Sequence, residues 1–111
     1  MRLNVKNVNS GGYVDSVVIP GPVILVGFAV DNSGPAQFIQ LHEAAALPAE
    51  GAVPIFPFRI ATEDLLPVWF GGEGRFFRTG LVLCNSSTAA TKTIGGENCW
   101  FDIQIAAPSE R

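Results

Sequence analysis

Glycine and proline interrupt this sequence so often that a long helix has almost no room to form. The chain has 111 residues, of which 12 are glycine and 8 are proline. The apolar segments between these residues are short, and several alternate apolar with polar side chains. That rhythm is typical of β-sandwiches and barrels. We therefore predict an all-β fold, a compact antiparallel β-sandwich of jelly-roll-like or Ig-like type with about seven or eight short strands.

The length of the chain fits one domain, which we place at residues 1–106, followed by a C-terminal tail at residues 107–111. Residues 23–31 form the strongest predicted strand, because an unbroken apolar run is typical of a central strand covered on both faces. In the last strand, residues 99–106, alternation turns Phe101, Ile103 and Ile105 towards the core. The other predicted strands are residues 2–8 and 53–60 at sheet edges, 13–19, 36–43, 65–70, and 80–85, which we pair with 99–106 in a hairpin.

The sequence carries few charges for a soluble domain. Charged residues make up 15% of the chain, hydrophobic residues make up 48%, and the formal net charge is −3. Soluble domains have about 25% charged residues. Either the exterior is rich in uncharged Ser, Thr, Asn and Gln, or partners cover part of the surface. We favour the second, in a homo-oligomer or a larger assembly. The lysines and arginines form no basic run, which argues against nucleic acid as a partner. The longest apolar stretch, residues 22–30, is too short to span a membrane, and we find no export signal.

No combination of residues in the sequence points to an active site. His42 is the single histidine, and nothing in the sequence places a nucleophile and an orienting acid beside it. We expect His42 to lie at an exposed or rim position. One histidine with two distant cysteines does not match a zinc site, and no loop has the acidic spacing of a calcium site. The sequence therefore predicts that the protein is not an enzyme and has no catalytic, cofactor-binding or metal-binding residues.

The two cysteines, Cys84 and Cys99, lie on the two strands of the predicted hairpin, so we predict that they are cross-strand neighbours. Two states are open to them. A disulfide between them would stabilise the domain by about 3 kcal/mol through the loop that it closes. Alternatively, both are buried thiols that act as small apolar side chains. The second state is favoured, because without an export signal the chain is made in a reducing compartment.

Phenylalanine dominates the aromatic residues, which favours packing in the core or at a subunit contact. The sequence has 8 phenylalanines, 2 tryptophans and 1 tyrosine. The tryptophans, Trp69 and Trp100, have two uses open to them: contact with other subunits, or exposed platforms for a carbohydrate with Asp, Asn or Gln beside them. We expect partners to be contacted by loops and edge strands. The candidate contact residues are Trp69, Phe70, Arg75, Arg78, Phe56 and Phe58.

Three segments carry a resemblance to a known group of proteins. They are VDNSGPAQFIQLHE at residues 30–43, LPAEGAVPIFPFRI at residues 47–60 and FRTGLVLCNSSTAATKT at residues 77–93. This pattern resembles small virion-associated proteins of tailed bacteriophages, over roughly residues 23–106. The resemblance implies a β-sandwich component of a capsid or tail, and it implies no active-site residues.

Two functions follow as expectations from the resemblance and from the aromatic residues. The first is a virion structural protein, with capsid decoration or cement as the leading role. It would be made in the host cytoplasm, reside in the virion, and contact the major capsid protein or other virion subunits. The second is a carbohydrate-binding or receptor-binding module of a tail fibre or of a secreted protein, which requires Trp69 or Trp100 to be exposed.

Overall fold

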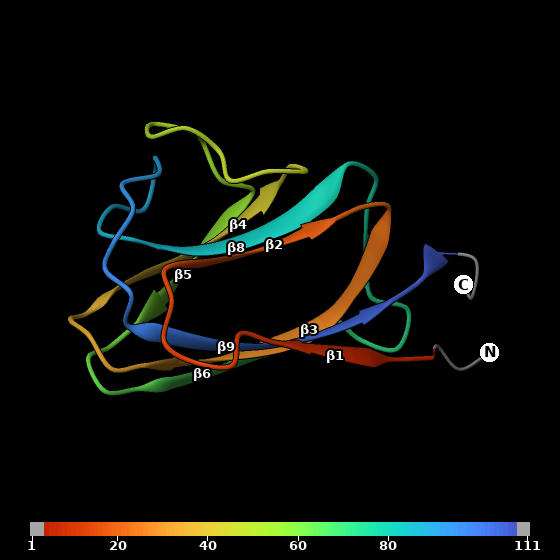
Figure 1. Ribbon diagram of the computed structural model, residues 1–111, viewed down its shortest axis with the longest axis horizontal. Coiled ribbons are helices and arrows are strands. Elements are labelled where there is room, and N and C mark those ends of the chain that lie inside the picture. The colour runs from red at the N-terminus through yellow and green to blue at the C-terminus, as the bar shows by residue number, and fades with distance from the viewer. Residues whose placement is uncertain (1–3, 109–111) are drawn as a thin grey trace.

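The computed structural model describes residues 4–108, which form nine β-strands in two antiparallel sheets (Figure 1). Sheet A has the spatial order β1-β9-β3-β6, with β7 also paired to β3, and sheet B has the order β2-β8-β4-β5. The sheets lie face to face without an α-helix between residues 4 and 108, so the predicted all-β sandwich is confirmed. The strands are β1 Lys6–Asn9, β2 Ser16–Pro20, β3 Val23–Asn32, β4 Gln37–Glu43, β5 Phe56–Ile60, β6 Leu65–Trp69, β7 Arg75–Phe77, β8 Gly80–Ser86 and β9 Cys99–Ala106.

The core lies between the two sheets and is built from the inward-facing side chains of both. The predicted central strand is confirmed: β3 lies between β9 on one side and β6 and β7 on the other. Its Leu25 and Phe28 point inward and are almost completely buried. On β9, Phe101 and Ile103 are fully buried, and Ile105 packs against the margin of the core. The predicted inward face of β9 is therefore confirmed as well.

The predicted hairpin between β8 and β9 is wrong. β8 lies in sheet B between β2 and β4, whereas β9 lies in sheet A between β1 and β3. The chain between them, residues 87–98, crosses from one sheet to the other at one end of the sandwich (Figure 1). Both strands are apolar enough to occupy the interior of a sheet, and β8 is buried at every position. Placing them in different sheets gives each sheet an apolar strand at its centre.

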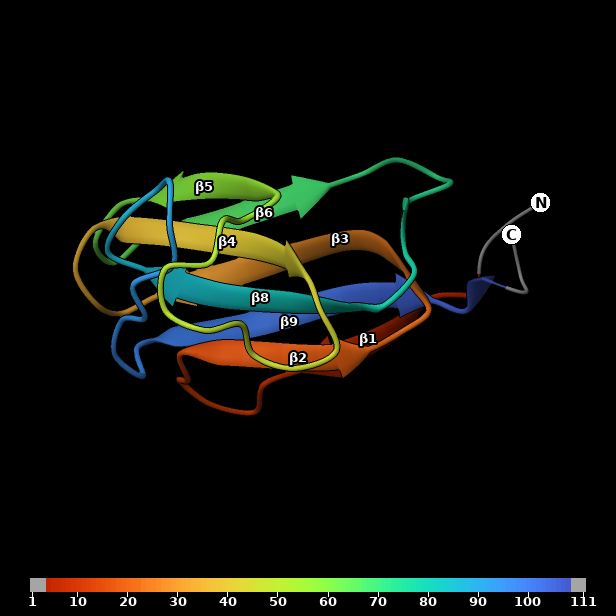
Figure 2. The same ribbon diagram turned by 90° about the horizontal axis from the view of Figure 1, so that it is seen from above.

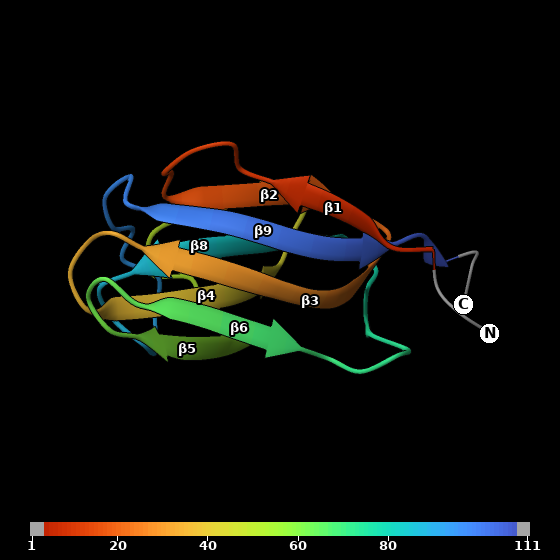
Figure 3. The same cartoon turned by 90° about the horizontal axis from the view of Figure 1, so that it is seen from below.

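The sandwich has a long free edge where β5 of sheet B and β6 of sheet A lie alongside each other (Figure 3). Pro57 in β5 and Pro67 in β6 lack the N–H group that would extend a ladder, which suits both strands to an edge. The predicted edge positions of the strands near residues 2–8 and 53–60 are confirmed by β1 and β5. Arg2 and Leu3 of the first prediction, and residues 109–111 of the predicted tail, lie outside the described residues.

The outer faces of the two sheets differ in what covers them. Two long loops, residues 44–55 and 87–98, lie over the outer face of sheet B, as the view from above shows (Figure 2). The outer face of sheet A is turned towards the viewer in Figure 3, and between residues 4 and 108 no segment of the chain crosses it. The molecule therefore has one covered sheet face and one open sheet face.

Candidate binding surfaces

An apolar hollow of about 290 Å³ opens at the free edge, near the start of β5. The backbone N–H of Ile55 donates to the carbonyl oxygen of Leu41 at 2.7 Å, which fixes the approach of the chain to β5. Four of the six predicted contact residues line this one hollow, although they come from three segments of the chain. The lining residues are Leu41, Ile55, Phe56, Phe58, Phe70 and Arg75.

Two of the aromatic rings that line the hollow pack against the hydrophobic core, and the third does not. Phe58 packs edge-to-face on the core residue Phe28, with 5.4 Å between ring centroids, and Phe70 lies 6.4 Å from the same ring. Phe56 lies 4.8 Å from Phe58 but remains 53% exposed, because the core ends at this point of the edge. Phe58 and Phe70 therefore form a fixed floor, and Phe56 is the ring that a partner could cover.

Arg75 brings a positive charge to the rim of the hollow. Its guanidinium carbon lies 5.8 Å from the centroid of the Phe77 ring, within the range of a cation–π contact. The Phe77 ring itself is fully buried, so the contact holds the arginine against a rigid surface. Phenylalanine and arginine are both enriched at protein–protein interfaces relative to the rest of the protein surface.

The other two predicted contact residues lie away from the hollow. Trp69 is 74% exposed and stands on the outer face of sheet A, opposite Gly27 of β3. Arg78 is exposed just after β7, where its backbone N–H donates to Oε2 of Glu43 at 2.8 Å. The sequence prediction missed Leu41 and Ile55, because their place in the hollow depends on the pairing of β4 with β5.

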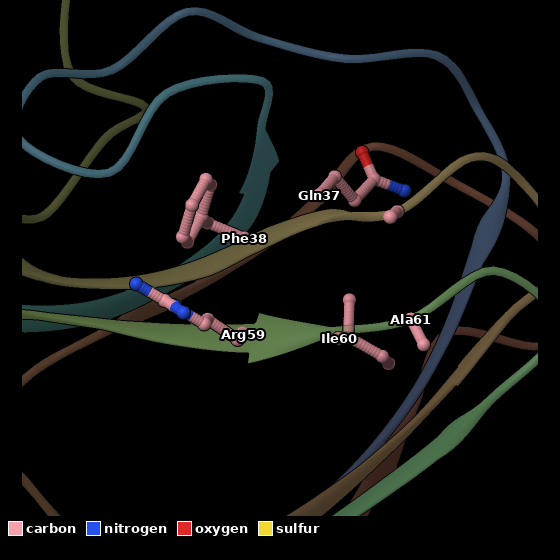
Figure 4. Close-up of a pocket in the computed structure, with 6 residues that line it drawn as sticks. Gln37, Phe38, Arg59, Ile60 and Ala61 are labelled. Atoms are coloured by element: carbon pink, nitrogen blue, oxygen red, sulfur yellow. The ribbon is translucent and has the colours of Figure 1, made fainter.

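A second hollow, of about 360 Å³, lies at the opposite end of the β4–β5 pair (Figure 4). Phe38 and Arg59 face each other across the two strands. The Nε2 group of Gln37 is engaged elsewhere, since it donates to Oδ1 of Asn32 at 2.9 Å and to Oδ1 of Asn98 at 2.8 Å. With one aromatic ring, this hollow offers a partner fewer anchors than the first. Its lining residues are Ala36, Gln37, Phe38, Arg59, Ile60 and Ala61.

Buried polar side chains on the outer face of sheet B hold the two loops in place. Gln40 is fully buried, and its Nε2 group donates to the carbonyl oxygens of Thr88, Ala89 and Thr91 at 2.9, 3.1 and 3.0 Å. His42 is 3% exposed and its Nε2 lies 3.0 Å from Oε1 of Gln40, so this nitrogen carries the hydrogen. The prediction that His42 is exposed or at a rim is wrong, because the loops cover its strand.

An ion pair joins the two loops to each other. Nζ of Lys92 lies 2.8 Å from Oε1 of Glu50, and the Lys92 side chain is almost completely buried. The hydrogen bond from Lys92 and another from the backbone of Ile94 hold the pKa of the Glu50 carboxyl below its usual value. Burial, and secondarily the Lys92 charge, lowers the pKa of His42 and favours its neutral form. The side chains of Gln40, His42, Glu50 and Lys92 therefore form hydrogen bonds within this face and stabilise the two loops.

Cys84 lies on β8 of sheet B and Cys99 lies on β9 of sheet A, so they are not cross-strand neighbours. Cys99 lies in the core between the sheets, where Nδ2 of Asn85 is 3.7 Å from its Sγ. Neighbouring residues of a strand point to opposite faces, so Cys84 points away from the core and beneath the loops. Both cysteines are free and buried. The structure therefore agrees with two buried thiols.

We expect both thiols to be unreactive while the protein is folded. Burial raises the pKa of Cys84 to about 12 and also raises the pKa of Cys99. Because the thiolate is the reactive form, iodoacetamide at pH 8 should alkylate either cysteine at least about 100-fold more slowly in the native protein than in denaturant. Mass spectrometry of timed samples measures both rates. A Cys84–Cys99 disulfide that forms on mild oxidation while the native circular dichroism spectrum is kept would contradict this placement.

The described part of the chain has neither a grouped set of metal-ligating side chains nor a membrane-spanning helix. Among residues 4–108, no three His, Cys, Asp or Glu side chains are grouped so that they could hold a metal ion. No helix in the same range is long and apolar enough to cross a membrane.

Comparison with known proteins gives one weak structural likeness. No protein-family model matches the sequence, and no curated protein matches it. Among solved structures, the chain is similar to one described as the cyanophage Pam1 capsid asymmetric unit, with 16% sequence identity over 97% of this chain and 88% of that chain. The TM-score is 0.39. A chain of a cyanophage capsid is thus a structural neighbour at low similarity.

Proposed function

We propose that this protein is a non-enzymatic structural subunit of a tailed-phage virion, and that it serves as a capsid decoration or cement protein. The observation that best supports a docking role is the hollow at the free edge, where Phe56, Phe58, Phe70 and Arg75 converge. The class of partner follows from the resemblance of residues 30–60 and 77–93 to virion-associated proteins. The major capsid protein is the leading partner, and other virion subunits are the alternative.

Docking at this edge would use side chains more than backbone. Pro57 interrupts the donors of the β5 edge, which disfavours continued strand pairing with another sheet. An apolar side chain from a partner would instead fill the hollow and cover the exposed part of Phe56. A well-buried aromatic anchor of this kind is typically worth about 2 kcal/mol or more of binding free energy.

The composition of purified virions tests this proposal. We expect the chain to be present in head particles in a fixed ratio to the major capsid protein, as measured by quantitative mass spectrometry. Decoration and cement proteins occupy repeated sites on a symmetric shell, so the ratio should not change between preparations. The proposal is wrong if the chain stays in the soluble fraction of infected cells, or if it is found with tails alone.

A further inference from the structure

We propose that the outer face of sheet A is a binding site for a neutral oligosaccharide. The site is separate from the hollow at the free edge and does not depend on the virion role. The strand register identifies the residues whose side chains lie on this face. β1 contributes Asn7 and Asn9, β9 contributes Trp100, Asp102 and Gln104, β3 contributes Gly27, Ala29 and Asp31, and β6 contributes Leu65, Pro67 and Trp69.

Aromatic rings stand at two opposite corners of this face. Trp69 is 74% exposed at the β6 side, and Trp100 is 37% exposed at the β9 side. Tyr13 packs edge-on against Trp100, with 5.4 Å between the ring centroids, and is itself 44% exposed. Exposed aromatic faces attract the C–H groups of sugar rings, because the face of the π-system is negative. The exposure of both tryptophans meets the requirement stated above for a carbohydrate-binding surface.

Small residues occupy the middle of the face. Gly27 has no side chain and Ala29 has only a methyl group, and together they form the central row between the two aromatic corners. A Cβ atom at Gly27 would lie 2.7 Å from the backbone oxygen of Val68 and 3.4 Å from the Trp69 side chain, so a larger residue is excluded there. A sugar ring can therefore approach the sheet closely in this row.

Hydrogen bonds hold the polar groups of the face in fixed positions. Nε1 of Trp100 donates to Oδ1 of Asn9 at 2.7 Å. Nδ2 of Asn9 and Nε2 of Gln104 donate to the Asp102 carboxylate at 3.4 and 3.2 Å. At the Trp100 corner, the Tyr13 hydroxyl donates to Oδ2 of Asp31 at 2.8 Å. Such preorganised groups lose little side-chain entropy when a ligand binds.

The charges of the face select for a neutral ligand that is rich in hydroxyl groups. At the outer-face positions of β1, β9, β3 and β6, the charged side chains are Asp31 and Asp102, with no lysine or arginine. Ionised carboxylates only accept hydrogen bonds, and sugar hydroxyls donate them. An anionic glycan would be repelled. A protein partner fits less well, because the centres of protein interfaces are depleted in charged residues.

The spacing of the aromatic corners requires an oligosaccharide rather than a single sugar. Trp69 pairs with Gly27, and Trp100 pairs with Asp31, four residues further along β3. At about 3.3 Å per residue along a strand and about 4.8 Å between strands, the two Cα atoms lie roughly 16 Å apart. A ligand that touches both rings must be an extended chain of several sugars, so a monosaccharide should compete poorly.

Intrinsic fluorescence offers a direct test, because both tryptophans of the chain lie on this face. A glycan array with neutral and acidic members comes first, and the hexasaccharides of the cello, malto and laminari series serve as soluble probes. We expect at least one neutral oligosaccharide to bind and to shift the tryptophan emission. The affinity should be insensitive to salt, because no ionic contact with the ligand is involved.

Substitutions test whether the oligosaccharide binds at the outer face of sheet A. Trp69→Ala should weaken it at least tenfold, Trp69→Phe should weaken it less, and Asp102→Asn should weaken it severalfold. Phe56→Ala, which removes an exposed ring from the separate hollow at the free edge, should leave glycan binding unchanged. The proposal is overturned if no neutral glycan binds, if only acidic glycans bind, or if binding survives both Trp69→Ala and Asp102→Asn. It is also overturned if Trp69→Ala abolishes capsid association and the wild-type protein binds no glycan, since the face is then a protein contact.

Discussion

Replacing Gln40 with alanine is expected to lower the free energy of unfolding by about 3 kcal/mol or more. The Gln40 amide is the shared donor for the carbonyl oxygens of Thr88, Ala89 and Thr91, and its oxygen accepts from His42. In Gln40→Ala the Ala89 carbonyl oxygen and the His42 ring lose this partner while the loop still shields them from water. The carbonyl oxygens of Thr88 and Thr91 then keep only hydroxyl donors. A loss of this size should lower the melting temperature by about 10 °C or more.

Chemical denaturation with a matched control measures this effect. Gln104→Ala removes the same side chain from the open face of sheet A, where Gln104 is partly exposed and donates to Asp102 alone. We expect the control to change the free energy of unfolding by no more than about 0.5 kcal/mol. Equal midpoints for Gln40→Ala and the wild type would show that the loops do not depend on this amide.

Replacing Phe56 with alanine is expected to weaken binding to capsids by about 10-fold to 30-fold while leaving the fold stable. Phe56 is 53% exposed at the mouth of the hollow, so its ring has apolar surface left for a partner to bury. Loss of an aromatic anchor worth about 2 kcal/mol corresponds to roughly a 30-fold loss of affinity. Phe58 packs on the core residue Phe28, so the floor of the hollow should remain in Phe56→Ala.

The matched control for this substitution is Phe76→Ala. Phe76 is a 41% exposed ring on β7, and alternation turns it to the opposite side of that strand from Arg75. Co-sedimentation with capsids gives the affinity of each variant, and circular dichroism confirms that each is folded. If both variants lose affinity equally, exposed apolar area in general drives association. If neither loses affinity, the hollow is not the docking site.

Most of the strands could be predicted because they are encoded by local pattern. The apolar run at residues 23–31 and the alternation at residues 99–106 match β3 and β9 closely. Pro57 also predicts an edge strand from the local sequence alone, because proline lacks the N–H group that a central strand needs for pairing. β7, with three residues, is too short to show a pattern and was missed.

Features that depend on distant contacts could not be predicted from local pattern. His42 alternates as a surface residue would, and it is buried only because loops held by the Glu50–Lys92 pair, 42 residues apart, lie over it. Because β8 and β9 are neighbours in sequence, local pattern favours a hairpin between them, whereas the fold places them in different sheets. In the candidate site, Trp69 and Phe70 are adjacent in sequence, but β6 directs Trp69 to the open face and Phe70 lies in the hollow.

Titration of the purified protein onto capsids that lack it tests the central claim most directly. The capsids come from a phage in which the coding sequence has been deleted, and bound protein is measured after sedimentation. We predict saturable binding at a fixed ratio to the major capsid protein, with Phe56→Ala requiring a higher concentration to reach the same plateau. No binding, or binding that rises without a plateau and is the same for Phe56→Ala, would contradict a capsid-binding role for this sandwich.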